Sequence, residues 1–97
     1  MEKRRHAASE ELCRAILSLQ TPEECEAFLE DICTIRELQD MAQRFAVAAM
    51  LDAGKNYQDI SKETGASTAT ISRVSRCLNY GSLGYRTVLD RRKEEQA

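Results

Sequence analysis

The sequence of 97 residues predicts an all-α protein of about six helices. No run shows the sustained alternation of apolar and polar residues that is typical of β-strands. Apolar residues instead recur at helical spacing, and residues suited to begin or end a helix stand at the boundaries of these stretches. A chain of this length forms one modest core. We therefore expect a single domain over residues 9–93, between a mobile leader at 1–8 and a frayed tail at 94–97.

The first two helices are predicted by an apolar stripe and by a helix-start motif. The stripe has i, i+3, i+4 and i+7 spacing and consists of Leu12, Ala15, Ile16 and Leu19. We expect Ser9 to cap this first helix. The run Thr21-Pro22-Glu23-Glu24 indicates the start of a second helix. Threonine can cap it, proline is tolerated in its first turn, and glutamate can close a capping box.

A third helix is predicted from the capping box Thr34-Ile35-Arg36-Glu37 to about Ala53, with Gly54 ending it. Its apolar residues occupy more than one face: Ile35, Leu38, Ala42, Phe45 and Ala49 on one, Val47, Met50 and Leu51 on another. A helix with so much apolar surface is buried on several sides. In so small a chain this favours a second subunit as part of its surroundings. The alternative is the central helix of a monomeric bundle.

Charge is unevenly distributed along the chain, whose formal net charge is −2. Residues 1–54 carry 6 basic and 11 acidic side chains, and residues 55–97 carry 8 basic and 5 acidic ones. The net charges of the two parts are therefore −5 and +3. Within Ala66–Lys93 the only acidic residue is Asp90. Such a segment can bind a polyanion if its cations share one face, and the alternative is a solvated helix face.

The sequence does not contain the residue patterns that are typical of metal-binding proteins, enzymes, and membrane or secreted proteins. The cysteines Cys13, Cys25, Cys33 and Cys77 form no Cys-x-x-Cys pair, and the single histidine is His6. We therefore expect no metal site and no cofactor, and we expect buried free thiols, with a disulfide framework as the alternative. We assign no catalytic residue, because no Gly-rich phosphate loop or histidine-paired nucleophile is present. No membrane span or secretory signal is recognisable, which favours a cytoplasmic protein.

Residues 57–78 have the spacing of a helix-turn-helix motif. Counted from Tyr57, such a motif has apolar residues at positions four, fifteen and eighteen, a small one at five and glycine at nine. This chain supplies Ile60, Ile71, Val74, Ser61 and Gly65. The apolar side chains pack two helices together at a steep angle, the small residue avoids a collision, and glycine adopts the left-handed turn. We expect Asn56 and Ser67 to cap the two helices.

The outward face of the second helix in this motif is polar and free of acidic residues. Small and hydroxylic side chains let a helix enter a major groove, where they contact base edges and thymine methyl groups. We predict that DNA is bound by Gln58, Ser67, Thr68, Ala69, Thr70, Ser72, Arg73 and Arg76. Similar helix pairs occur in proteins that bind no DNA. The rival interpretation is a helical interaction module whose basic end binds an acidic protein partner.

The run Gly65–Arg73 resembles the DNA-reading segment of the tryptophan repressor family, which has the pattern Gly-Ala-x-x-Ala-Thr-Ile-x-Arg. The likeness includes Gln43-Arg44 and the helix end at Leu51–Gly54, and it covers most of the chain. The run Ser72–Gly81 is similar to the YerC/YecD-type branch of Trp repressor-like regulators. This resemblance implies an intertwined homodimer of six helices per chain. It also implies a repressor of transcription that binds double-stranded DNA at a palindromic operator.

The resemblance also bears on a small-molecule effector. Arg44 and Arg73 match in position two arginines that hold the corepressor in the tryptophan repressor. The family has glycine after the second arginine, where the indole needs room, and this chain has Val74. Because an isopropyl group there overlaps an aromatic ring, we expect an altered effector pocket and no response to tryptophan. The favoured alternative for the two arginines is structural pairing or phosphate contact.

Overall fold

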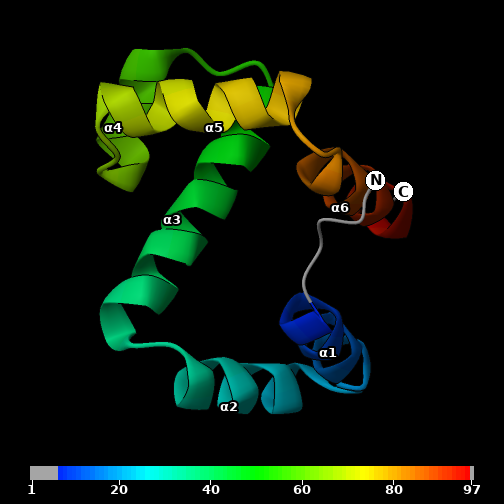
Figure 1. Ribbon diagram of the computed structural model, residues 1–97. Helices are drawn as coiled ribbons and strands as arrows, with labels where there is room; N and C mark the ends of the chain where they lie inside the picture. The colour runs from blue at the N-terminus through cyan, green and yellow to red at the C-terminus, as the bar shows by residue number, and fades with distance from the viewer. Residues whose placement is uncertain (1–6, 97) are drawn as a thin grey trace. The chain divides into compact units, whose positions relative to one another are not determined.

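The computed structural model describes residues 7–96 and contains six α-helices and no strand within that range (Figure 1). The all-α prediction is therefore confirmed. The chain divides into two compact units, one ending at Leu38 and the other beginning at Gln39. The helices are α1 (Ala7–Leu17), α2 (Pro22–Ile32), α3 (Ile35–Asp52), α4 (Tyr57–Thr64), α5 (Thr68–Tyr80) and α6 (Gly84–Gln96). None of these helices combines the length and apolar character needed to cross a bilayer.

Helices α2 and α3 begin at the predicted capping boxes. At α2, the Glu24 N–H donates to Thr21 Oγ1 at 3.1 Å. Glu24 Oε1 in turn accepts from the N–H of Gln20 at 2.8 Å, one residue before the usual donor. At α3, the Glu37 N–H donates to Thr34 Oγ1 at 3.0 Å and the Thr34 N–H donates to Glu37 Oε1 at 2.8 Å. Local hydrogen bonding thus fixes where both helices start.

Helix α1 begins earlier than the sequence indicated. It starts at Ala7 and includes Ser9 in its first turn, so the prediction that Ser9 caps it was wrong. A serine inside the first turn is already helical, and its side chain cannot take the extended N-cap position. Residues 1–6 of the predicted leader lie outside the described part of the chain.

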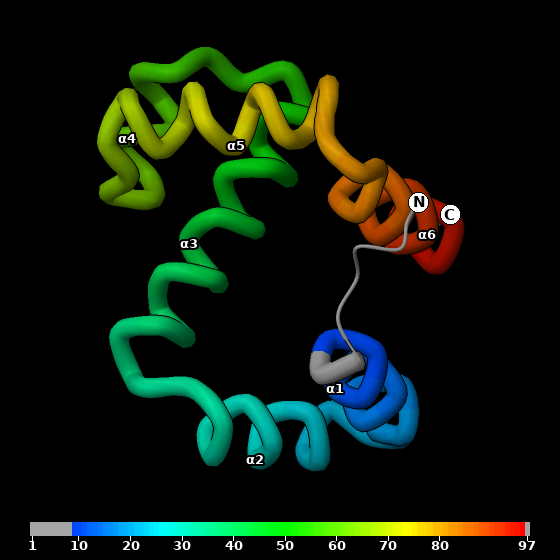
Figure 2. The backbone as a smooth tube through the Cα atoms, viewed as in Figure 1, coloured from blue at the N-terminus to red at the C-terminus, as the bar shows by residue number. Residues whose placement is uncertain are grey.

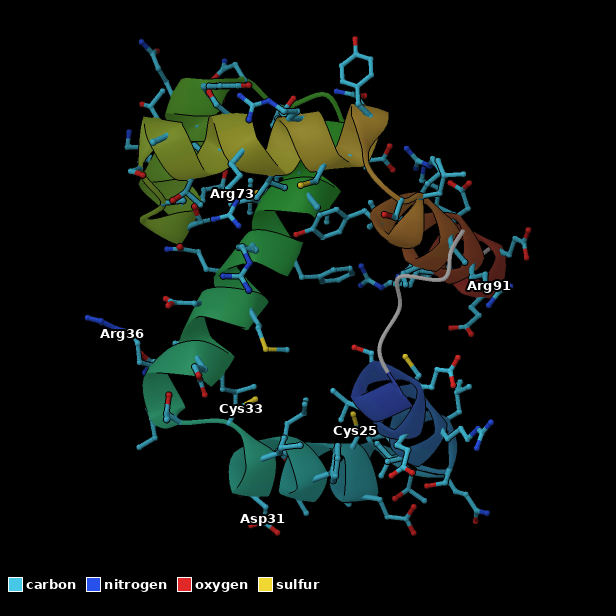
Figure 3. The ribbon with its side chains drawn as sticks, in the orientation of Figure 1. Cys25, Asp31, Cys33, Arg36, Arg73 and Arg91 are labelled. Carbon is cyan, nitrogen blue, oxygen red and sulfur yellow. The ribbon has the colours of Figure 1, made fainter. Side chains whose placement is uncertain are left out.

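None of the four cysteines forms a disulfide, and none of them is buried. Cys13 and Cys77 are exposed, whereas Cys25 and Cys33, at opposite ends of α2, are half-buried (Figure 3). The prediction of buried free thiols was therefore wrong on burial. Within the described residues of the first unit no side chain is fully buried, so the cysteines there have no closed core to enter. No group of three or more possible metal ligands occurs among residues 7–96.

The core lies in the second unit and draws on four helices. In Figure 2, α5 crosses the C-terminal end of α3, and α4 lies beside α5. The chain reaches α4 through a Schellman turn, in which the N–H of Gly54 donates to Leu51 O at 3.0 Å and that of Lys55 to Met50 O at 3.1 Å. The φ of Gly54 is +88°, as the predicted helix end requires. The buried cluster comprises Val47, Ala48, Ile60, Ala66, Ile71, Val74, Leu78 and Leu89.

An ion-pair cluster at Asp52 joins the end of α3 to α6. Arg86 Nη2 lies 2.9 Å from Asp52 Oδ1, and Lys93 Nζ lies 2.8 Å from Asp52 Oδ2. The Asp52 side chain is only 13% exposed. Its position at a helix C-terminus is unfavourable for an anion, and the two cations offset this. Helix α6 continues to Gln96, so residues 94–96, assigned by sequence to the tail, are helical.

We predict that Asp52→Asn lowers stability at neutral pH and weakens its dependence on acid. The hydrogen bond from Lys93, helped by that from Arg86, holds the pKa of Asp52 below its ordinary value of 3.8. The ionised carboxylate therefore stabilises the fold above about pH 4, and this contribution is lost as the pH falls through the folded-state pKa. Urea unfolding between pH 7 and pH 3 measures the effect. The difference in the free energy of unfolding between the two proteins should become smaller in acid. A difference that does not change with pH would contradict the assignment.

Candidate nucleic-acid interface

The segment from α4 to α5 forms a helix-turn-helix whose two caps are as predicted. Asn56 Oδ1 accepts from the N–H of Asp59 at 2.9 Å, and Ser67 Oγ accepts from the N–H of Thr70 at 3.1 Å. Between the helices, Gly65 has φ +77° and ψ 4°, the left-handed conformation that its position demands. The second helix continues to Tyr80, two residues beyond the predicted end of the motif.

Side-chain hydrogen bonds hold the turn in shape. The Ser61 hydroxyl donates to Ala66 O at 2.8 Å, and the Ala66 N–H donates to Thr64 Oγ1 at 3.1 Å. Gln43 on α3 adds a long-range bond, from Nε2 to Thr64 O at 3.1 Å. The small residue that the motif needs at position 61 thus also satisfies a backbone carbonyl. The role of Gln43 was not predicted, although Gln43-Arg44 belonged to the family resemblance.

Beneath the motif, the three predicted apolar side chains pack into the core. Ile60 and Ile71 are 0% exposed and Val74 is 2% exposed. Val74 therefore fills core volume at the position where the resembled family keeps glycine. Burying a side chain of this size stabilises a fold by about 1.5–3 kcal/mol. Because Ile60 comes from α4 and the other two from α5, their burial in one core holds the two helices against each other.

The opposite side of α5 is polar, and α5 contains no acidic residue. We name as the reading face the outward residues Ser67, Thr68, Ala69, Ser72, Arg73 and Arg76. All are exposed except the half-buried Ser72, while the predicted Thr70 is half-buried and Gln58 lies exposed on α4. The Ser67 hydroxyl lies 3.1 Å from Thr70 Oγ1, so Thr70 takes part in the cap. Gln58 and Thr68 line one hollow between the two helices.

The two arginines of the predicted effector pocket come from different helices. Arg73 is exposed on α5 (Figure 3), and Arg44 is half-buried on α3. Neither forms an ion pair with a carboxylate among residues 7–96. By contrast, Arg86 and Lys93 of α6 both pair with Asp52. Some basic residues of the second unit therefore form ion pairs that stabilise the fold, whereas Arg44 and Arg73 have no carboxylate partner among the described residues.

This arrangement of helices and side chains indicates the class of protein to which the chain belongs. A capped helix-turn-helix on an apolar core, with an acid-free outer helix face, is typical of helix-turn-helix DNA-binding proteins. The Trp repressor protein family model matches residues 7–93, and the chain belongs to this family of DNA-binding regulators.

Individual proteins that are similar to this chain support its membership of the family. The chain is 53% identical over 96 residues to a Bacillus subtilis (strain 168) protein named "Uncharacterized protein YerC", covering 99% of this chain and 92% of that one. A crystal structure of a TrpR like protein from Eubacterium eligens ATCC 27750 is 53% identical, covers 92% of both chains and has a TM-score of 0.87. A Staphylococcus aureus crystal structure is 49% identical, covers 94% of this chain and 91% of that one, and has a TM-score of 0.88. The predicted resemblance is confirmed.

We predict that Gly65→Ala destabilises the protein by about 1–2 kcal/mol, because a Cβ disfavours the left-handed conformation. Collision is not the cause, since a Cβ there would meet only Gln43 Nε2 at 4.0 Å. Gly84→Ala is the matched control, because a Cβ there meets nothing within 4 Å and φ is not positive. Chemical denaturation should show a loss for the first variant and none for the second. Equal losses would show that the turn does not require glycine.

Proposed function

We propose that the protein is a sequence-specific, double-stranded DNA-binding transcription regulator that acts as a homodimer on a palindromic operator. We expect it to act as a repressor in the cytoplasm and to need no metal or cofactor. The observation that carries the proposal is the reading face, which has no carboxylate and lies on a helix held by a buried core; its two arginines have no ion-pair partner among residues 7–96. Membership of the Trp repressor family supports it.

The proposal gives the reading face two kinds of role. Thr68, Ala69 and Ser72 are short enough for α5 to approach base edges and thymine methyl groups in a major groove. Arg76 lies further along the helix, where a guanidinium reaches phosphate, and Gln58 approaches the backbone from α4. Base contacts select the sequence, whereas phosphate contacts supply affinity and register.

The homodimer is supported by apolar side chains that one chain leaves in water. The largest exposed fractions in the first three helices belong to Leu17 at 82% and Ile35 at 79%, and Ile32 is 52% exposed. A second subunit would remove these large apolar side chains from water. If association and folding are coupled, the melting temperature should rise with protein concentration. A concentration-independent melting temperature and a monomer mass at micromolar concentration would contradict the dimer.

We predict that Ala69 and Arg76 variants fail in different ways. A bulky residue in place of Ala69 should change which duplex is preferred, because it alters the surface that meets the bases. Arg76→Ala should weaken all duplexes alike and reduce the slope of log affinity against log salt by about one for each subunit. Fluorescence titrations of several duplexes at four salt concentrations measure both. The same pattern for both variants would contradict the roles. Binding of an acidic protein without any duplex preference would favour the rival interaction module.

We predict that tryptophan does not regulate this protein. Val74 occupies buried volume where an indole would need room, and overpacking costs about 1–3 kcal/mol, or about one to two powers of ten in affinity. Titration calorimetry should show no saturable heat, and added tryptophan should leave duplex affinity unchanged. Val74→Gly is the companion variant, in which the space opens at a cost in stability. A saturable micromolar affinity in the unaltered protein would contradict the steric argument.

A further inference from the structure

A hollow lies between α4 and the start of α5, beside the reading face. It has a volume of about 320 Å³ and is lined by Tyr57, Gln58, Ser61, Lys62 and Thr68. Neither Tyr57 nor Lys62 was among the residues that the sequence predicted to contact DNA. The lining includes one cation, one amide and three hydroxyl groups, and it includes no carboxylate. The polar groups of the lining are all able to donate hydrogen bonds to an oxyanion.

The charges of α4 are sorted by helix face. Gln58 and Lys62 are four residues apart and share the face that lines the hollow, whereas Asp59 and Glu63 lie on a neighbouring face. Glu63 is paired with Lys55, whose Nζ lies 3.2 Å from Glu63 Oε2. Lys62 is exposed and has no ion-pair partner among residues 7–96. Lys62, the one basic residue of α4, therefore lines the hollow.

The donors in the hollow are unequally occupied. The Ser61 hydroxyl already donates to Ala66 O at 2.8 Å, so it serves the turn. The side chains of Tyr57, Gln58, Lys62 and Thr68 form no hydrogen bond or ion pair with another side chain or carbonyl among residues 7–96, so they can bind a ligand. Thr68 is also the first residue of α5, where backbone N–H groups have no acceptor within the helix. An anion seated here would meet donors from both helices of the motif at once.

We propose that this hollow seats one phosphate of the DNA backbone, with Lys62 as its cation and Tyr57, Gln58 and Thr68 as hydrogen-bond donors. The inference rests on the proposed function and adds two contact residues to it. Because Thr68 belongs to both the hollow and the reading face, the seated phosphate is adjacent to the bases that Ala69 approaches. Clamping that phosphate between α4 and α5 fixes the register of the reading face along the groove.

The test compares two lysines of the same motif. Lys62→Gln should weaken binding to every duplex by about fivefold or more at physiological salt and reduce the salt slope by about one for each subunit. Lys55→Gln also removes one positive charge, but Lys55 Nζ already lies 3.2 Å from Glu63 Oε2. Because Glu63 offsets the charge of Lys55, this variant should change the salt slope far less. Tyr57→Phe, which deletes only a hydroxyl, should weaken binding without changing the slope. Equal effects of the two lysine variants would overturn the inference.

A second measurement locates the phosphate. Single neutral methylphosphonate linkages are placed in turn along the duplex that the unaltered protein prefers. At one position per half-site, the substitution should weaken the unaltered protein but not Lys62→Gln, since the two changes remove the same contact. Additive losses at every position would overturn the inference even if the protein selects a duplex. Failure of the unaltered protein to prefer any duplex would instead overturn the proposed function.

Discussion

The packing of Ile60, Ile71 and Val74 into the core of the second unit is the interaction on which the remaining features depend. These three side chains are almost completely buried, together with Val47 and Ala48 of α3. They determine how α5 lies against α4, and so which side of α5 faces solvent. The caps and the turn at Gly65 decide where the helices begin and end, but only the core fixes their angle. Removing a buried aliphatic side chain of this kind costs about 2–5 kcal/mol.

Val74 belongs to the buried core and is the residue on which the proposed lack of a tryptophan response depends. Its isopropyl group fills the slot that the helix pair offers, so the protein completes the space beneath α5 with its own side chain. A core completed in this way does not need a bound aromatic ring to hold α5 in place. We infer that the helix-turn-helix is organised without an effector. Arg44 and Arg73 have no carboxylate partner among the described residues.

Much of the fold could be predicted because its signals are local. The capping boxes at Thr21 and Thr34, the glycines at the ends of α3 and α4, and the helix-turn-helix spacing each depend on a few neighbouring residues. Ser9 was misassigned because α1 starts before it and the apolar stripe does not mark the first turn. The cysteines were expected to be buried because composition does not show which of the two units contains a closed core.

The features that were missed join residues distant in sequence. Gln43 donates to a carbonyl twenty-one positions away, and Asp52 binds cations from a helix that starts more than thirty residues later. Neither partner is specified by periodicity or by a motif. The hollow that contains Lys62 likewise exists only once α4 and α5 are packed together. Sequence patterns indicated which residues of α5 lie on the reading face. The hydrogen-bond donors that surround this face could be identified only from the structure.

The most direct test of the central claim is selection of duplexes by the purified, full-length protein from a pool with a randomised central segment. The account predicts enrichment of one palindromic consensus, with half-sites about one helical turn apart, since two copies of α5 would enter successive major grooves. Enrichment should be lost at high salt, because phosphate contacts supply much of the affinity. A pool that stays random through repeated rounds, at low as well as physiological salt, would contradict the account.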